Sequence, residues 1–147
     1  MLESGEPSWL VIDGYEDEPA AFGVPPYVGF HIRYICGVLE RSDISYEYMT
    51  IDQYRQNVTD LDNRLGVVLF AGAVVPGKYL RGAPISLRET REIISNIPGD
   101  VPILCGGWAI RGWRHQGWRP LRQNLFLALK DTDATLENYL KNNEWKH

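Results

Sequence analysis

The sequence has little cysteine and no long apolar run. Cys36 and Cys105 are its two cysteines, and neither belongs to a CxxC pair or has a histidine at metal-ligand spacing. No stretch approaches the roughly 20 apolar residues that are needed to cross a bilayer, and nothing at the N-terminus resembles a secretory signal. These absences predict a cytoplasmic protein with free thiols, no metal site and no membrane partner.

An excess of basic residues is also missing. The chain has 15 Lys and Arg against 19 Asp and Glu, for a net charge of -4, whereas a dedicated nucleic-acid binder usually carries a net basic surface. The two common phosphate-binding fingerprints, GxGxxG and GxxxxGK[ST], do not occur. No Ser/His/Asp or Cys/His arrangement can be assembled either. The sequence therefore predicts no nucleic-acid partner and no catalytic residues in this chain.

What the sequence does contain is a regular alternation of apolar runs and amphipathic segments. Residues 65–72 are continuously apolar, which is typical of a central parallel strand with helices on both faces. Ser86 precedes Glu89 by three residues in a capping-box pattern, so a helix is predicted to begin near Leu87. Further strands are predicted at 9–13, 44–52, 101–107 and 124–131, and further helices at 31–43 and 133–145.

This alternation predicts an α/β fold that is flavodoxin-like, or Rossmann-like, with a doubly wound sheet. We expect five mainly parallel strands in the order 2-1-3-4-5, with the polar, alternating strand at 44–51 on an edge. A chain of 147 residues with 44% hydrophobic content suits a single domain, residues 1–147.

Long connections follow the first, third and fourth predicted strands, at residues 14–30, 71–86 and 106–120. In an open parallel sheet these loops lie at the carboxyl edge, where ligands bind. The third loop carries Trp108, Trp113 and Trp118 among several arginines. Such rings could stack on a single-stranded nucleic acid, but we favour packing against a partner domain.

Titratable residues are also expected near this edge. An acidic run, 16–18, lies close to Asp13 and could hold a hard cation or serve acid-base chemistry. His31 and His115 fall near the same loops. Most acidic runs of this kind are simply solvated, however, and a lone histidine is more often a structural or surface residue than a ligand.

Four stretches together resemble the N-terminal, cobalamin-binding-like domain of archaeal radical SAM proteins. They are VIDGYEDEPAAFGVPPYVGFHIRYICGVL (11–39), YMTIDQYR (48–55), LFAGAVVPGKYLRGAPIS (69–86) and PILCGGWAIRG (102–112). In that family a second, downstream domain carries a CxxxCxxC motif that binds an iron-sulfur cluster for S-adenosylmethionine cleavage. This chain has no such motif. The resemblance therefore implies a non-catalytic N-terminal domain whose partner is the C-terminal radical SAM domain of a longer enzyme.

The resemblance also implies cobalamin as the cofactor. Typical domains that ligate cobalt through histidine carry DxHxxG after the first strand, but here Tyr15 stands at the His position and Glu18 at the Gly position. A corrinoid would thus be held without a protein ligand below cobalt. The implied cofactor-binding residues are Gly14, Tyr15, Gly72, Gly106 and Gly107. The alternative is a degenerate domain that has lost the cofactor and serves as a docking module.

Overall fold

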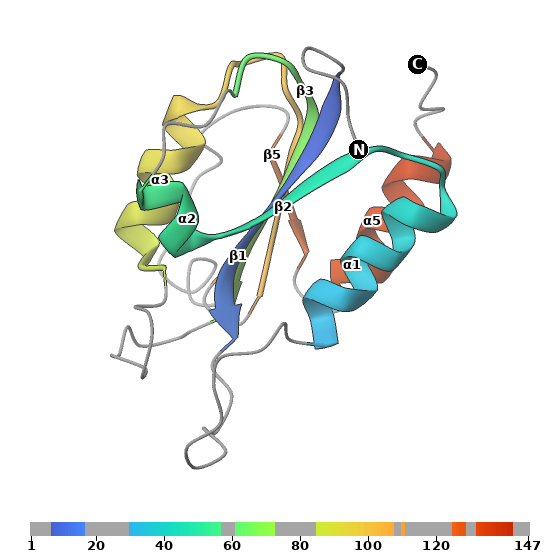
Figure 1. Ribbon diagram of the computed structural model, residues 1–147, viewed down its shortest axis with the longest axis horizontal. Helices are drawn as coiled ribbons and strands as arrows, with labels where there is room; N and C mark the ends of the chain where they lie inside the picture. The colour runs from blue at the N-terminus through green and yellow to red at the C-terminus, as the bar shows by residue number, and fades with distance from the viewer. Residues whose placement is uncertain are drawn as a thin grey trace.

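The computed structural model describes residues 7–16, 30–56, 61–72, 85–107, 110, 125–128 and 132–142, and side chains are not described for residues 15, 16, 30 and 72. Its described strands form one sheet of five parallel strands in the order β2-β1-β3-β4-β5 (Figure 1). The strands are β1 (Ser8–Glu16), β2 (Tyr46–Thr50), β3 (Arg64–Gly72), β4 (Ile103–Gly106) and β5 (Leu125–Ala128). The helices are α1 (Phe30–Arg41), α2 (Ile51–Gln56), α3 (Leu87–Asn96) and α5 (Thr132–Asn142).

The order of the strands confirms the predicted flavodoxin-like, doubly wound topology. β3 is central, pairing with β1 on one side and β4 on the other, and its buried residues 66–71 are those of the continuous apolar run. β2 lies on an edge of the sheet, as its polar alternation predicts. From β1 the chain first adds β2 on one side of the sheet and then adds β3, β4 and β5 on the other. The strand order therefore reverses between β1 and β3, and this pair is the switch point of the fold.

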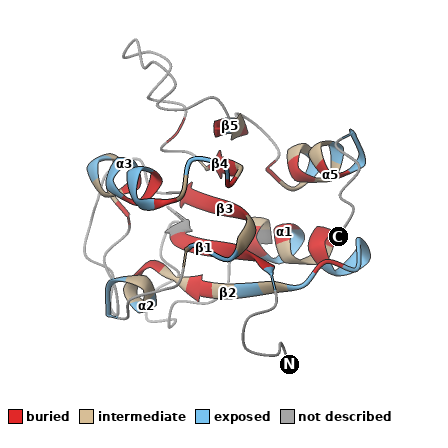
Figure 2. Cartoon of the chain, turned by 90° about the horizontal axis from the view of Figure 1, so that it is seen from above, coloured by how far each residue is buried: buried red, intermediate tan, exposed pale blue. Residues whose placement is uncertain are grey.

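The helices form a layer on each face of the sheet (Figures 1 and 2). One layer holds α1 and α5, and the other holds α2 and α3. Alternate residues of β1 divide between the two faces, so that Trp9 and Val11 face α1 and α5 while Leu10 and Ile12 face α2 and α3. Each face therefore has its own buried apolar cluster, separated by the sheet.

Helix α3 begins as the capping pattern predicts. The Ser86 hydroxyl accepts a hydrogen bond of 3.0 Å from the backbone N–H of Glu89, which satisfies one of the free donors of the first turn. The Glu89 carboxylate pairs with Arg55 of α2 instead, accepting from Nη2 at 2.6 Å and from Nε at 2.8 Å. This bidentate pair ties α2 to α3 on the outside of their layer.

Most predicted elements differ from the observed ones only at their ends. β5 is described over Leu125–Ala128, within the predicted 124–131, whose other residues lie outside the described ones, and α1 ends at Arg41 rather than at residue 43. Asp43 adopts a positive φ of 55° in the turn that follows α1, a conformation that ends a helix. None of the described helices is long and apolar enough to span a membrane.

Candidate functional site

The candidate site is the edge of the sheet where β1, β3 and β4 end. Pairing of parallel strands places Asp13 beside Phe70, and Phe70 beside Gly106. The predicted cofactor-binding positions lie at these strand ends: Gly14 and Tyr15 in β1, Gly72 in β3, Gly106 in β4 and Gly107 directly after it. The structure thus brings all five backbone positions to one edge, next to the switch point.

Gly14 is covered by the segment that leads into α3. The backbone N–H of Ile85 donates a 3.1 Å hydrogen bond to the carbonyl oxygen of Gly14, and Ile85 is completely buried. A Cβ added at Gly14 would overlap the Ile85 side chain and the backbone oxygen of Phe70. The space that the missing side chain leaves is therefore taken up by the protein itself.

Gly106 has the same kind of neighbour on the other face of the sheet. A Cβ added there would overlap Thr132, whose Cγ2 would lie 2.7 Å away. Thr132 is the first residue of α5 and is buried. The glycine thus allows the beginning of α5 to pack directly on the end of β4.

Gly107 makes the turn that leaves the sheet. Its φ of 106° is one that residues with a side chain rarely adopt. Its carbonyl oxygen accepts a 3.2 Å hydrogen bond from the backbone N–H of Ile110. The second glycine of the pair is therefore required by the backbone conformation of the turn.

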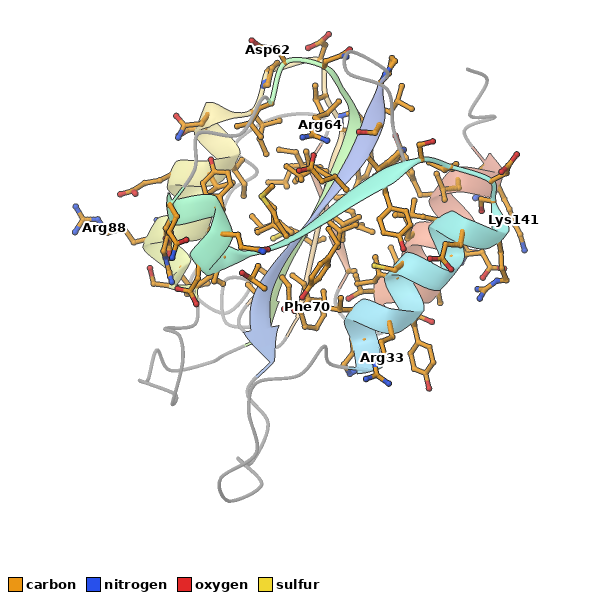
Figure 3. All side chains as sticks on the ribbon, in the orientation of Figure 1. Arg33, Asp62, Arg64, Phe70, Arg88 and Lys141 are labelled. Atoms are coloured by element: carbon orange, nitrogen blue, oxygen red, sulfur yellow. The ribbon has the colours of Figure 1, made fainter. Side chains whose placement is uncertain are left out.

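An aromatic pair occupies the α1 side of the edge. The His31 ring stacks on Phe70 with centroids 5.7 Å apart and planes inclined by 25°, and Phe70 is only 2% exposed. Figure 3 shows Phe70 between the sheet and α1. The α1 side of the edge is thus occupied by two packed rings of the chain itself.

The contacts at Gly14 and Gly106 bear on whether a corrinoid could approach these positions. Close approach of a ligand to backbone requires open space over the glycines, and Ile85 and Thr132 fill that space at Gly14 and Gly106. At these two positions the space beside the glycine is therefore filled by side chains of the chain itself.

A buried carboxylate at the same edge was only partly predicted. Asp13 is 3% exposed, and the Tyr48 hydroxyl of β2 donates to its Oδ2 at 2.8 Å. The sequence pointed to Asp13 as a neighbour of the acidic run but did not identify Tyr48. The signal was the alternation of β2, which places Tyr46 and Tyr48 on the face towards α1.

Tyr46, two residues before Tyr48 in β2, makes a similar contact with α1 further from the carboxyl edge. Its hydroxyl donates to Glu40 Oε1 of α1 at 2.6 Å. Cys36 lies close by, and burial is the main cause that raises the pKa of its thiol, with the hydrogen bond to Tyr46 opposing it. Burial raises the pKa of the Cys105 thiol as well. Both thiols are therefore weaker nucleophiles than an exposed cysteine.

Several predicted features lie outside the described residues. They are Asp17 and Glu18 of the acidic run, His115, and the three tryptophans of the third loop, Trp108, Trp113 and Trp118. Among the residues that the structure does describe, no group of three or more His, Cys, Asp or Glu side chains could hold a metal ion.

Comparison with known proteins finds archaeal relatives. A segment of 99 residues, 66% of this chain, is 39% identical to an uncharacterized protein of Methanocaldococcus jannaschii and covers 18% of that protein. A segment of 82 residues, 54% of this chain, is 48% identical to an uncharacterized protein of Archaeoglobus fulgidus and covers 16% of it. No family profile and no solved structure matches the chain. The chain thus spans less than a fifth of the length of these relatives.

Proposed function

We propose that this chain is a non-catalytic, cobalamin-binding-like domain of a longer archaeal radical SAM protein, in a form that has lost the corrinoid and serves as a docking module. The observation that carries this proposal is the filled carboxyl edge. Ile85 closes over Gly14, and Thr132 closes over Gly106, at the backbone positions where the cofactor would have to approach.

The chemistry of the edge agrees with a non-catalytic role. Asp13 is buried and holds a hydrogen bond from Tyr48, and the two cysteine thiols have raised pKa values. Nucleophilic catalysis by cysteine depends on a lowered pKa or an adjacent base. The described contacts of the edge are structural ones: Tyr48 joins β2 to β1 through Asp13, and Tyr46 joins β2 to α1 through Glu40.

The relatives support a place within a larger protein. In both, more than four fifths of the sequence lies outside the matched segment. A domain with a closed edge can still contribute a rigid surface against which other domains pack. The proposed partner is the C-terminal radical SAM domain of the longer protein.

Titration of the purified chain with hydroxocobalamin tests the loss of the cofactor. We expect no change in the visible spectrum of the corrinoid and no retention on equilibrium dialysis. A matched variant, Thr132→Gly, removes the side chain that covers Gly106 and shows whether opening this position is enough to admit the ligand. A saturable spectral change at one equivalent of wild-type chain would contradict the proposal.

That opposite result would support the second candidate, a domain that binds cobalamin without a histidine ligand. The observation in its favour is the convergence of three glycine-containing strand ends at the switch point, together with the turn at Gly107. Binding would then require Ile85 or Thr132 to move away from the glycine that it covers. Protection of the Ile85 amide, which donates to the Gly14 carbonyl, from hydrogen exchange should then fall on adding hydroxocobalamin.

A further inference from the structure

Helix α1 has a solvent-facing side that the fold itself does not use. Its buried residues Ile32, Ile35 and Leu39 lie towards the sheet, and at about 100° per residue the opposite side is formed by other residues. We call this side the α1 outer face. It consists of the half-buried Gly37 and four exposed residues, Arg33, Tyr34, Glu40 and Arg41.

One flank of the α1 outer face carries two opposite charges. Arg33 and Glu40 are separated by about two helical turns, so they lie on the same side of Gly37. Glu40 accepts a 2.6 Å hydrogen bond from Tyr46, which places this flank towards β2. Arg33 forms no ion pair within the residues that the structure describes, and Figure 3 shows it projecting from the beginning of α1. The flank therefore has a cation near one end of the helix and an anion near the other.

The other flank carries a ring and a cation. Tyr34 is 55% exposed, and Arg41 follows it at the same spacing as Glu40 follows Arg33. Arg41 lies 3.6 Å from Glu137, which places this flank towards α5, and its side chain is still 67% exposed. An exposed pair of this kind contributes little to stability. The face of a tyrosine ring attracts a guanidinium group, so the two residues of this flank are also complementary to each other.

Gly37 lies between the two flanks, in the middle of α1. A glycine there destabilises a helix relative to alanine. At Gly66 an added Cβ would overlap the Trp9 ring, but at Gly37 it would meet only Nη1 of the flexible Arg41 side chain, 3.3 Å away. The described structure therefore gives no strong internal reason for this glycine. A missing side chain on the outside of a helix allows a second helix to pack closely.

The order of these residues makes the α1 outer face complementary to itself. Two α1 helices can pack antiparallel about a two-fold axis that passes between their Gly37 residues. Flanks of the same kind then meet, with their residues in reversed order. Arg33 lies opposite the partner's Glu40, and Tyr34 lies opposite the partner's Arg41. Because of the two-fold symmetry, each of these contacts occurs twice.

From the glycine and the two reciprocal contacts, we propose that the α1 outer face is a docking surface for a second copy of this chain, in a two-fold dimer with antiparallel α1 helices. The α5 helices of the two copies lie on the same side of the contact and extend it. A surface centred on one helix is small for a stable interface, so the dimer should exchange with monomer as the protein is diluted. The proposal concerns self-association and does not rest on the loss of the corrinoid.

Sedimentation velocity of the 147-residue chain, over about 10 µM to 1 mM, measures the equilibrium between monomer and dimer. Arg33→Glu places two anions opposite each other at both symmetric contacts, and Glu40→Arg places two cations there. Each variant should weaken dimerisation about tenfold or more. An equimolar mixture of the two variants should dimerise about as well as the wild type, because each then supplies the charge that the other lacks.

The controls separate this local effect from net charge. Arg88→Glu and Glu92→Arg make the same charge changes on the exposed side of α3 and should leave dimerisation unchanged. Since the chain has a net charge of -4, repulsion between whole molecules would make Arg33→Glu weaken the dimer and Glu40→Arg strengthen it. The proposal instead expects both to weaken it.

Gly37→Gln tests the close approach of the two helices. The longer side chain should weaken dimerisation about tenfold or more, because it holds the helices apart. It should also raise the unfolding temperature of the dilute, monomeric chain, because glutamine has a higher helix propensity than glycine. A rise in the unfolding temperature shows that the loss of dimer does not come from misfolding.

Three results would overturn the proposal. The first is a wild-type chain that stays monomeric up to about 1 mM, which would leave the α1 outer face to an unlike partner. The second is a dimer that all three α1 variants form as well as the wild type does. The third is a mixture of the two charge variants that dimerises no better than either alone, which would exclude the antiparallel contact. The titration with hydroxocobalamin is independent of all three.

Discussion

Tyr48 joins an edge strand to the switch point of the sheet by donating a 2.8 Å hydrogen bond to Asp13. Tyr48 belongs to β2, and Asp13 lies in β1 near the point where β1 and β3 end. Because Asp13 is 97% buried, its carboxylate depends on protein donors rather than on water. The contact therefore stabilises the carboxyl edge of the sheet beside the ends of β1 and β3.

Tyr48→Phe should lower the free energy of unfolding by about 1–3 kcal/mol, since the buried carboxyl of Asp13 loses a hydrogen-bond donor. Tyr46→Phe is the matched control on the same strand. Its hydroxyl donates to Glu40, which is exposed, so the expected loss is under about 1 kcal/mol. Urea denaturation followed by circular dichroism measures both. Equal losses would show that Asp13 does not depend on Tyr48.

Gly37→Ala should stabilise the isolated chain by about 0.5–1 kcal/mol, because alanine has a higher helix propensity and meets only the movable Arg41 head group. Gly66→Ala is the contrasting variant, since its Cβ would overlap the buried Trp9 ring. It should destabilise the chain. Thermal denaturation of both variants checks the prediction, and a destabilising Gly37→Ala would point to an internal role for that glycine.

Much of the fold could be predicted from local sequence. The apolar run at 65–72 indicated a central strand, and Ser86 with Glu89 located the start of α3 correctly. These features depend on residues close together in the chain, where periodicity and capping act directly. The partner of the Glu89 side chain was not predictable in this way, because Arg55 lies 34 residues away in the sequence.

Less of the candidate site than of the fold could be predicted from the sequence. The glycines at 14, 72, 106 and 107 indicated a place where backbone is approached closely, and the five predicted positions do share one edge. A glycine, however, admits a neighbouring side chain as readily as a ligand. Only the three-dimensional structure shows that Ile85 and Thr132 are the neighbours at two of these positions.

Stability should fall at alkaline pH. Burial is the main cause that raises the pKa of Cys36 and Cys105 above their ordinary value of 9.0, and it raises that of Tyr46 above 10.0. The folded state then keeps protons that the unfolded state loses, so the stabilisation is complete below about pH 9 and declines as the pH rises further. Cys36→Ala should reduce this decline. Urea denaturation at several pH values measures it, and a constant free energy of unfolding above pH 9 would contradict the prediction.

Double-mutant cycles can show which neighbouring atoms fill the space at Gly106 and at Gly14. Gly106→Ala should destabilise the chain by about 1–3 kcal/mol through overpacking against Thr132. Thr132→Gly removes the overlapping atoms, so the same Gly106→Ala change should cost clearly less in that background.

Gly14→Ala should behave differently, because its Cβ would meet the backbone oxygen of Phe70 as well as Ile85. Adding Ile85→Ala should therefore not recover the lost stability, since the clash with the backbone remains. Both double-mutant cycles are measured by urea denaturation. If Gly106→Ala were as stable as the wild type, Thr132 would not fill that position, and the main argument against a bound corrinoid would fail.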